Sequence, residues 1–371
     1  MNFELNEEQE AVRELAEQIF SSLSSVERVK EIEASDDRID RDLWSALADA
    51  NILGLAIPEA YGGSDLGLLE LTLALEQQGR VVAPVPLAAT TVSGALAISE
   101  FGTDAQKERI LPGVVKGEII LSAALAEIGV NDPLNPQVQA TLVLDRWSLS
   151  GTKFAVPAGM QADILVVPAR TPDGVAVFLV DTNDPSLSRV SAFTTDRSQV
   201  AHVTFLDSPA EMLGDGGHPG ERIVQWILDR SIISLCAIQI GVCEAAVKMA
   251  ANYTSAREQF GRPLSAFQAT QVRAADAYID TEAIRVTTLL AAWKADAGQE
   301  ITADALVAKW WAAEAGQRVV HAVQHLHGGV GADIEYPVHR YFLWGKQIED
   351  TLGGANATLE SLGRVLAKMG V

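Results

Sequence analysis

The part of the sequence from about residue 219 to the end consists of long Ala- and Ile-rich stretches with helical periodicity. These stretches run from about 220 to 256, 266 to 296, 302 to 326 and 341 to 369, with short joints between them. Long helices with short joints favour an antiparallel four-helix bundle. Their apolar faces are too broad for a monomer, so we expect bundles to pack against bundles in an oligomer.

The two preceding parts have different patterns. Before about residue 118, apolar residues recur at helical spacing, as in Val12, Leu15, Ala16 and Ile19. From 118 to 212, short β-rich runs such as ATLVL, DILVVPA and VAHVTF alternate with Asp, Gly and Pro. We therefore predict an α+β protein with three domains. They are an N-terminal α-helical domain (1–117), a middle β-barrel or sandwich domain (118–212) and a C-terminal four-helix bundle (213–371).

Composition limits the possible partners. A chain of 371 residues with 48% hydrophobic content is long enough for two or three domains with their own cores. The net charge of -21 argues against nucleic-acid binding, and any anionic ligand must meet a local basic cluster. No apolar run is expected to reach the length of a membrane span, and the acidic start MNFELNEEQE is unlike a signal peptide. Cytoplasmic residence is the simplest interpretation.

Two groups of residues could in principle form a disulfide bond or a metal site. Cys236 and Cys243 lie seven residues apart on one predicted helix, roughly 10 Å apart and too far for a disulfide. We expect buried thiols in a reducing compartment. His321 and His325 share a helical face, with His327 nearby, but no acidic or cysteine partner completes a set of ligands, so no metal site is predicted.

The segment YTSAREQFGRPLSAFQ, residues 253–268, carries the strongest functional signal. Arg257 supplies a guanidinium, and Phe260 follows beside the turn residues Gly261 and Pro263 at a predicted helix end. A bidentate cationic donor beside a flat apolar ring suits a phosphate that is attached to an aromatic group.

The segment HLHGGVG, residues 325–331, follows a long Ala-rich helical stretch. Its glycines Gly328, Gly329 and Gly331 predict a loop in which the backbone can approach a ligand closely. Alone, this pattern is weak evidence, because most such glycines are helix caps or tight turns. Its pairing with the preceding segment makes a ligand site the better interpretation.

With these two segments, and with IPEAYGGSDLG at 57–67 and YPVHRYF at 336–342, the chain resembles acyl-CoA dehydrogenases almost end to end. The resemblance implies FAD-dependent α,β-dehydrogenation of an acyl-CoA thioester. In that reaction a carboxylate removes the α-proton, a hydride leaves the β-carbon for flavin N5, and a carrier such as electron-transfer flavoprotein reoxidises the flavin. By the same resemblance, the cofactor-binding residues face a flavin held mainly by a neighbouring subunit. They are Arg257 at the pyrophosphate, Gln259, Phe260 and Gln268 nearby, and His325, Gly328 and Gly329 along the adenosine half.

The carboxylate that this chemistry requires is missing from both places where the family carries it. One place corresponds to Gly353, followed by Gly354 and Ala355. The other lies about ten residues before Gly241 and corresponds to Ser231. Neither side chain can remove a proton from a carbon acid, so we predict no catalytic residue in this chain.

The middle domain departs from the family pattern in the same direction. The family's Thr-Glu-Pro segment corresponds to 126–128, where Ala126 lacks the hydroxyl that would bond the flavin ring, while Glu127 is retained and Ile128 replaces Pro. Its Trp-Ile-Thr segment corresponds to Phe154, Ala155 and Val156 and loses a second hydroxyl. His325 stands where Gln is usual and still offers a donor.

Three hypotheses remain open. The first is a non-catalytic subunit that completes the FAD site of a related catalytic subunit in an α2β2 tetramer, as in actinobacterial enzymes of steroid side-chain degradation. The second is a self-sufficient homotetramer with a relocated base. The carboxylates available for it are Asp350, the best placed, and Glu349, Asp229 and Glu244. The third is a scaffold protein without flavin, in which Arg257 has no ligand.

Overall fold

The computed structural model describes residues 4–130 and 132–370. Contacts divide the chain into two compact units, each assembled from separated segments. The first unit comprises Met1–Lys30, Leu68–Ala83 and Ile232–Val371, and the second comprises Glu31–Gly67 and Pro84–Ser231. The predicted division of the sequence into three domains stays a prediction.

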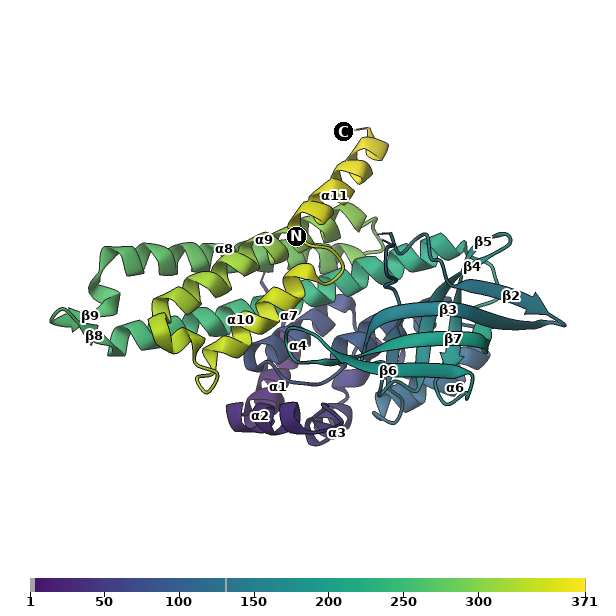
Figure 1. Cartoon of the computed structure of the whole chain (residues 1–371), viewed down its shortest axis with the longest axis horizontal. Coiled ribbons are helices and arrows are strands. Elements are labelled where there is room, and N and C mark those ends of the chain that lie inside the picture. The colour runs from purple at the N-terminus through teal and green to yellow at the C-terminus, as the bar shows by residue number, and fades with distance from the viewer. Residues whose placement is uncertain (1–3, 131, 371) are drawn as a thin grey trace. The chain divides into compact units, whose positions relative to one another are not determined.

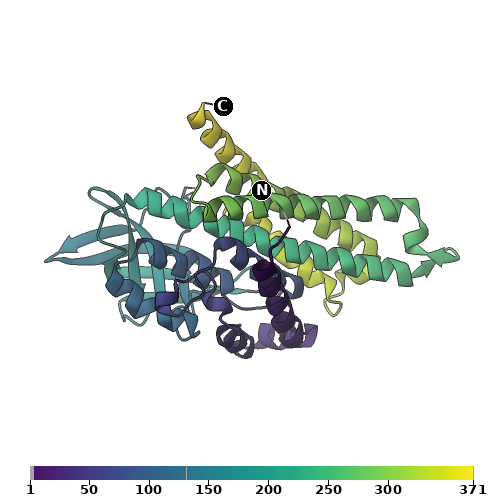
Figure 2. The same ribbon diagram turned by 180° about the vertical axis from the view of Figure 1, so that it is seen from behind.

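The first unit is helical. Its α8 and α9 lie side by side, and α10 and α11 pack on α9 (Figure 1, and from behind in Figure 2). A capping box between Asn6 and Gln9 starts α1. The helices with residues in this unit are α1 (Glu7–Leu23), α2 (Val26–Ala34), α4 (Leu68–Val81), α7 (Gly220–Ala256), α8 (Gln268–Asp296), α9 (Thr302–His327), α10 (Val338–Asp350) and α11 (Ala355–Met369).

Three of the four predicted C-terminal helices are confirmed to within two residues. The fourth prediction, one helix from 341 to 369, is wrong, because α10 ends at Asp350 and α11 begins at Ala355. Leu352 has φ +57° and Gly353 has φ +108°, and neither value is helical. The sequence showed Gly353 and Gly354 but not that one helix ends and another begins there.

In the first unit, α4 and α7 approach each other closely through two glycines. A Cβ built on Gly79 would lie 2.1 Å from the Ile238 carbonyl oxygen. One built on Gly241 would lie 2.0 Å from the Glu76 carbonyl oxygen. Real Cβ atoms do not come this near to a backbone, so this crossing requires glycine on both helices.

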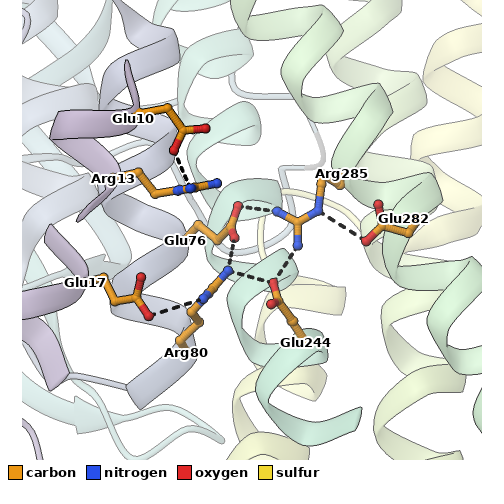
Figure 3. Close-up of polar contacts among 8 residues, drawn as sticks. All are labelled: Glu10, Arg13, Glu17, Glu76, Arg80, Glu244, Glu282 and Arg285. Carbon is orange, nitrogen blue, oxygen red and sulfur yellow. Dashed lines mark hydrogen bonds and ion pairs between the residues drawn. The ribbon is translucent and has the colours of Figure 1, made fainter. Parts of the chain in front are cut away.

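Four charged residues lie beside this crossing and form one network (Figure 3). Arg285 on α8 donates to Glu76 and to Glu244, at 2.6 Å in each case. Arg80 donates to the same two carboxylates at 2.9 Å. Burial opposes the charge on Arg285, but the attraction of Glu76, Glu244 and Glu282 exceeds it, so the pKa of Arg285 is raised. Two cations and two carboxylates therefore tie α4, α7 and α8 together.

The second unit is built around a seven-stranded, mostly antiparallel sheet with the order β1-β4-β2-β3-β7-β5 and β6 paired to β7. Phe178 and Phe205 are among the side chains buried in it. The strands are β1 (Leu121–Ala123), β2 (Gln139–Val143), β3 (Arg146–Pro157), β4 (Ile164–Thr171), β5 (Gly174–Asp181), β6 (Leu187–Phe193) and β7 (Gln199–Met212). The helices wholly within this unit are α3 (Arg41–Asp49), η1 (Ile52–Gly54), η2 (Glu59–Tyr61), η3 (Ala88–Ala95), α5 (Leu96–Phe101) and α6 (Asp104–Val115). The prediction of a β domain after helical segments is confirmed.

One expectation about membranes needs correction. By length and composition, α7 (Gly220–Ala256) could cross a membrane, although we expected no such run. Within the structure, however, 67% of its apolar window is buried. Burial of this extent is typical of a helix in a protein core.

Both cysteines are free and fully buried, as the sequence predicted. Burial raises the pKa of the Cys236 thiol to about 12, and it also raises the pKa of Cys243. Both therefore remain neutral thiols at physiological pH.

A buried lysine lies in the same core. The ammonium of Lys309 donates to the carbonyl oxygens of Ile348 at 2.7 Å and Glu349 at 3.0 Å, which belong to the last turn of α10. Burial lowers the pKa of Lys309 from 10.5 to about 8, against the opposing effects of Cys236, Asp350 and Glu349. The lysine thus caps α10 just before this helix ends.

This lysine predicts a dependence of stability on pH. Between pH 8 and 10.5 the unfolded chain retains a proton on Lys309 that the folded chain has released. Lys309 should therefore make the free energy of unfolding rise with pH across this range, by up to about 3 kcal/mol. The two buried thiols act in the opposite direction, because their pKa is raised and the unfolded chain loses those protons first.

The test is therefore the difference in the free energy of unfolding between the wild type and Lys309→Met, measured by urea unfolding from pH 7 to 11, which should rise with pH. The difference between the wild type and Lys248→Met, which removes an exposed lysine, should stay constant. A difference between the wild type and Lys309→Met that does not change with pH would contradict the assignment.

Candidate functional site

The segment after α7 forms a small hairpin at one end of the helical bundle (Figure 1). Its strands β8 (Glu258–Gln259) and β9 (Arg262–Pro263) pair Gln259 with Arg262. The two turn residues, Phe260 at φ +58° and Gly261 at φ +80°, both have the positive φ that a type I′ turn requires. A positive φ is unusual for phenylalanine. This turn leaves the Phe260 ring 91% exposed.

Cationic and aromatic groups gather on the hairpin. The Arg262 guanidinium lies 4.1 Å from the centroid of the Phe267 ring, and Phe260 meets the same ring edge-to-face with centroids 6.3 Å apart. Arg257 and Gln259 are exposed beside them. The local basic cluster that an anionic ligand requires on this acidic protein is therefore present.

Next to the hairpin, a groove of about 740 Å³ runs between α8 and α9. Gln268 and Arg273 of α8 line it, together with Arg318 of α9. Arg273 also donates to Nδ1 of His325, near the end of α9. The hairpin, the first turns of α8 and the end of α9 thus meet at one end of the bundle, and every sequence-predicted cofactor residue lies there.

The predicted glycine loop follows directly after α9. Gly328 has φ +61°, and a Cβ built on Gly328 or Gly329 would meet nothing within 4 Å. The backbone here is open to a ligand, in contrast to Gly331, whose Cβ would lie 2.5 Å from the Gln324 carbonyl oxygen. Gly328 and Gly329 are therefore the accessible pair, and Gly331 is a packing residue.

The histidines of this region make different packing contacts. His327 is buried and stacks on Tyr253, with ring centroids 4.7 Å apart, so it holds the ends of α7 and α9 together. His321 packs edge-on against Phe342. Across residues 4–130 and 132–370, no cluster of three or more metal-ligating side chains occurs. The structural role of His327 was missed because its aromatic partner lies far away in the sequence.

The first expected position of the base is Gly353 in the helical unit. Its φ of +108° lies in a region that side-chain-bearing residues rarely adopt. A glutamate placed there would be strained, whatever space surrounds it. The following Gly354 precedes the first turn of α11 and carries no side chain either.

The second expected position, Ser231, lies in the unit that contains the sheet. Its side chain is buried, and its hydroxyl shares a 2.8 Å hydrogen bond with the hydroxyl of Ser93 in η3. This position therefore holds the neutral hydroxyls of Ser231 and Ser93 and no carboxylate. A serine hydroxyl is far too weak a base for a carbon acid.

The four alternative carboxylates are engaged elsewhere or lie in water. Glu244 belongs to the network with Arg80 and Arg285. Glu349 pairs with Lys346, and Asp229 accepts a 2.8 Å hydrogen bond from Gln225. Asp350 is exposed at the end of α10, and its charge lies near enough to Lys309 to oppose the lowering of that lysine's pKa.

In the sheet unit, Glu127 makes a buried ion pair with Lys153 at 2.6 Å. The backbone N–H groups of Gln137 and Val138 donate to the same carboxylate at 2.7 and 3.3 Å. Burial lowers the pKa of Lys153, although Glu127 opposes the shift. Glu127 therefore anchors the loop that precedes β2, a role that the motif comparison did not reveal.

The segment Phe154–Ala155 is also rearranged locally. The backbone N–H of Ala155, which has φ +48°, donates to Nδ1 of His202 at 3.2 Å. The ring of Phe154 packs on His202 with centroids 4.8 Å apart. His202 thus accepts the hydrogen bond of the Ala155 backbone and packs against the Phe154 ring.

The residues at the bundle end suit the two chemical parts of FAD. Exposed guanidinium groups match phosphate oxygens, exposed Phe260 offers a flat face, and the open backbone at Gly328 and Gly329 allows close approach. All seven predicted residues face outward rather than into an enclosed cavity. A cofactor bound here therefore needs a second surface to cover it.

Comparison with known proteins agrees with this geometry. Family models described as the N-terminal and C-terminal domains of acyl-CoA dehydrogenase match residues 6–118 and 218–366. Acyl-CoA dehydrogenase FadE27 of Mycobacterium tuberculosis is 37% identical, over 99% of both chains. The solved "Tcur3481-Tcur3483 steroid ACAD G363A variant" contains a chain with 48% identity and a TM-score of 0.93, and the match covers 98% of this chain and 99% of that one. A chain of the ChsE4-ChsE5 complex of Mycobacterium tuberculosis has 38% identity and a TM-score of 0.93, with 99% of both chains covered. The chain belongs to the acyl-CoA dehydrogenase family, whose cofactor is FAD.

Proposed function

We propose that this chain is a non-catalytic subunit of a heteromeric acyl-CoA dehydrogenase and completes the FAD site of a related catalytic subunit. The observation that carries the proposal is the backbone at Gly353, whose φ of +108° disfavours any side chain at the position of the missing base. The Ser231–Ser93 pair at the other position supports it.

The proposal assigns a task to each group at the bundle end. Arg257 binds the pyrophosphate of the partner's FAD as a charged bidentate donor, with Gln259, Phe260 and Gln268 beside it. His325 and the open backbone at Gly328 and Gly329 lie along the adenosine half. When bound, the flavin accepts the hydride from the substrate, and the carboxylate that removes the proton comes from the partner.

The relatives suggest the partner and the substrate class. Both solved structures are named for two different proteins, which supports an α2β2 assembly of related chains. One of them is named a steroid ACAD, which supports a steroid side-chain acyl-CoA as the substrate. An electron-transfer flavoprotein is the proposed acceptor, and the cytoplasm is the proposed location.

The first test is native mass spectrometry of the purified chain, with released flavin counted. A chain that retains little flavin alone and gains it on co-expression with a related subunit would support the proposal. A homotetramer with one FAD per chain and dehydrogenase activity would overturn it.

The residue-level prediction concerns Arg257. In the purified complex, Arg257→Ala should weaken FAD retention by roughly 10- to 100-fold, because one charge-assisted contact is worth about 1.5–3 kcal/mol. The control variant is Arg364→Ala, which removes another exposed arginine, on α11. Flavin is released and quantified after dialysis. Equal flavin content in the two variants would mean that Arg257 does not contact the cofactor.

A further inference from the structure

The helical unit contains a small cavity of about 190 Å³, where the end of α1, the start of α2, the end of α4 and the start of α10 come together. At ~30 Å³ per water molecule, this volume corresponds to about six waters. It is therefore large enough for a small organic molecule. Most of its wall is apolar and consists of Val26, Val29, Val81, Val82, Pro337 and Tyr341.

One polar side chain in this wall lacks a hydrogen-bond partner. Ser24, at the end of α1, lines the cavity and is only 6% exposed. Its buried hydroxyl oxygen makes no hydrogen bond to any other group in residues 4–130 and 132–370. The neighbouring Ser25 differs, because its hydroxyl accepts the backbone N–H of Arg28 at 3.1 Å in the first turn of α2. Since an unsatisfied buried hydroxyl is costly, the Ser24 hydroxyl is suited to donate to a molecule in the cavity.

A buried guanidinium belongs to the same wall. Arg340, in the first turn of α10, lines the cavity and is only 4% exposed. Within the part of the chain that the structure describes, no acidic side chain lines the cavity. Nearby, Lys30 and, more weakly, Arg340 lower the pKa of the exposed Glu335, which pairs with Lys30 at 2.6 Å. The cavity wall therefore carries a positive charge, on a protein whose net charge is -21.

Together these features select one kind of ligand. A guanidinium binds a carboxylate through two parallel hydrogen bonds, and the Ser24 hydroxyl offers a further donor. Aliphatic walls favour an apolar body, and they would leave the remaining oxygens of a phosphate without partners. A monocarboxylate with a short aliphatic body satisfies both the polar and the apolar parts of the wall.

We propose that this cavity binds a small aliphatic monocarboxylate, whose carboxylate is held by Arg340 and Ser24. None of its lining residues is among the predicted cofactor residues. A ligand here contacts segments from α1, α2, α4 and α10 at once, so its binding stabilises the folded chain. The proposal does not depend on which subunit carries a working flavin.

Titration with hexanoate tests the proposal, by calorimetry on the full chain with any co-purifying subunit retained. Hexanoate should bind and should raise the melting temperature. Hexanamide has the same body without the charge and should bind at least about tenfold more weakly. Acetate and inorganic phosphate, which lack the aliphatic body, should also bind more weakly. Equal binding of hexanoate and hexanamide, equal binding of hexanoate and phosphate, or no hexanoate binding would each overturn the proposal.

Two variants assign the binding to this cavity. Arg340→Met should lower the hexanoate affinity at least about tenfold, whereas Arg364→Met, on exposed α11, should leave it unchanged. Ser24→Ala should lower the affinity about fivefold.

The Ser24→Ala variant also keeps the test decisive if Arg340→Met fails to fold. It removes a hydroxyl that has no partner among the described residues, so the melting temperature of the ligand-free protein should not fall. A hexanoate affinity that stays unchanged in either folded variant would overturn the proposal.

Discussion

Replacing Gly241 with alanine should lower the free energy of unfolding by at least about 3 kcal/mol. The new Cβ would lie 2.0 Å from the Glu76 carbonyl oxygen and 2.6 Å from the Arg80 nitrogen. Both atoms belong to the backbone of α4, so no flexible side chain can move away, and the two helices must separate. Separation would also pull apart the charged network beside the crossing.

The control for this prediction is Gly363→Ala. Gly363 lies within α11, and a Cβ built there meets nothing within 4 Å. Alanine should stabilise this helix by about 0.5–1 kcal/mol, because glycine is the poorer helix former. Thermal and urea unfolding of the two variants should therefore shift in opposite directions. Equal shifts would show that α4 and α7 are not in tight contact at Gly241.

Replacing Arg285 with methionine should destabilise the protein by about 3–5 kcal/mol, because it leaves the buried carboxylate of Glu76 without one of its two cations. The side chain of Glu76 is only 4% exposed, and Arg285 is one of its two ion-pair partners, at 2.6 Å (Figure 3). Methionine keeps the apolar stem and most of the volume, so the loss reports on charge rather than on packing.

The matched variant is Arg364→Met, which breaks an exposed pair with Glu360 one turn away on α11. Exposed pairs of this kind contribute about 0.3–0.5 kcal/mol. Adding Glu244→Gln to Arg285→Met should recover much of the stability, because Glu76 and Arg80 then remain as one ion pair. If Arg285→Met costs no more than Arg364→Met, the network makes no net contribution.

The helices and the strands were predictable because their patterns are local. Apolar residues at a period of 3.6 placed α7, α8 and α9 to within two residues of their ends. The break between α10 and α11 was not predictable in the same way. Glycines that end a helix and glycines that pack inside one look alike in a sequence, as Gly353 and Gly345 show: a Cβ on the buried Gly345 would meet Val320 at 2.6 Å.

The candidate site likewise has features that the sequence determines and features that only the structure shows. The sequence alone determined that no carboxylate stands at 231 or 353, since folding cannot supply a side chain that the chain lacks. It also determined that Arg257, Phe260 and Gly328 are present at a spacing typical of the family. The tertiary structure decided where these groups point. It also decided that Lys153 pairs with Glu127 and that His202 accepts a hydrogen bond from the backbone N–H of Ala155.

The helix α8 shows why the structure was needed. Its apolar residues can be read from the sequence, but only the fold determines that Ile284 is buried and that Ile279 is exposed. The burial of a helix face depends on segments that are distant in the chain, and no local sequence pattern shows where those segments pack. Identity and helical periodicity are local properties and were fixed by the sequence itself. Burial, pairing and the left-handed backbone at Gly353 arise from long-range packing and were decided by the tertiary structure.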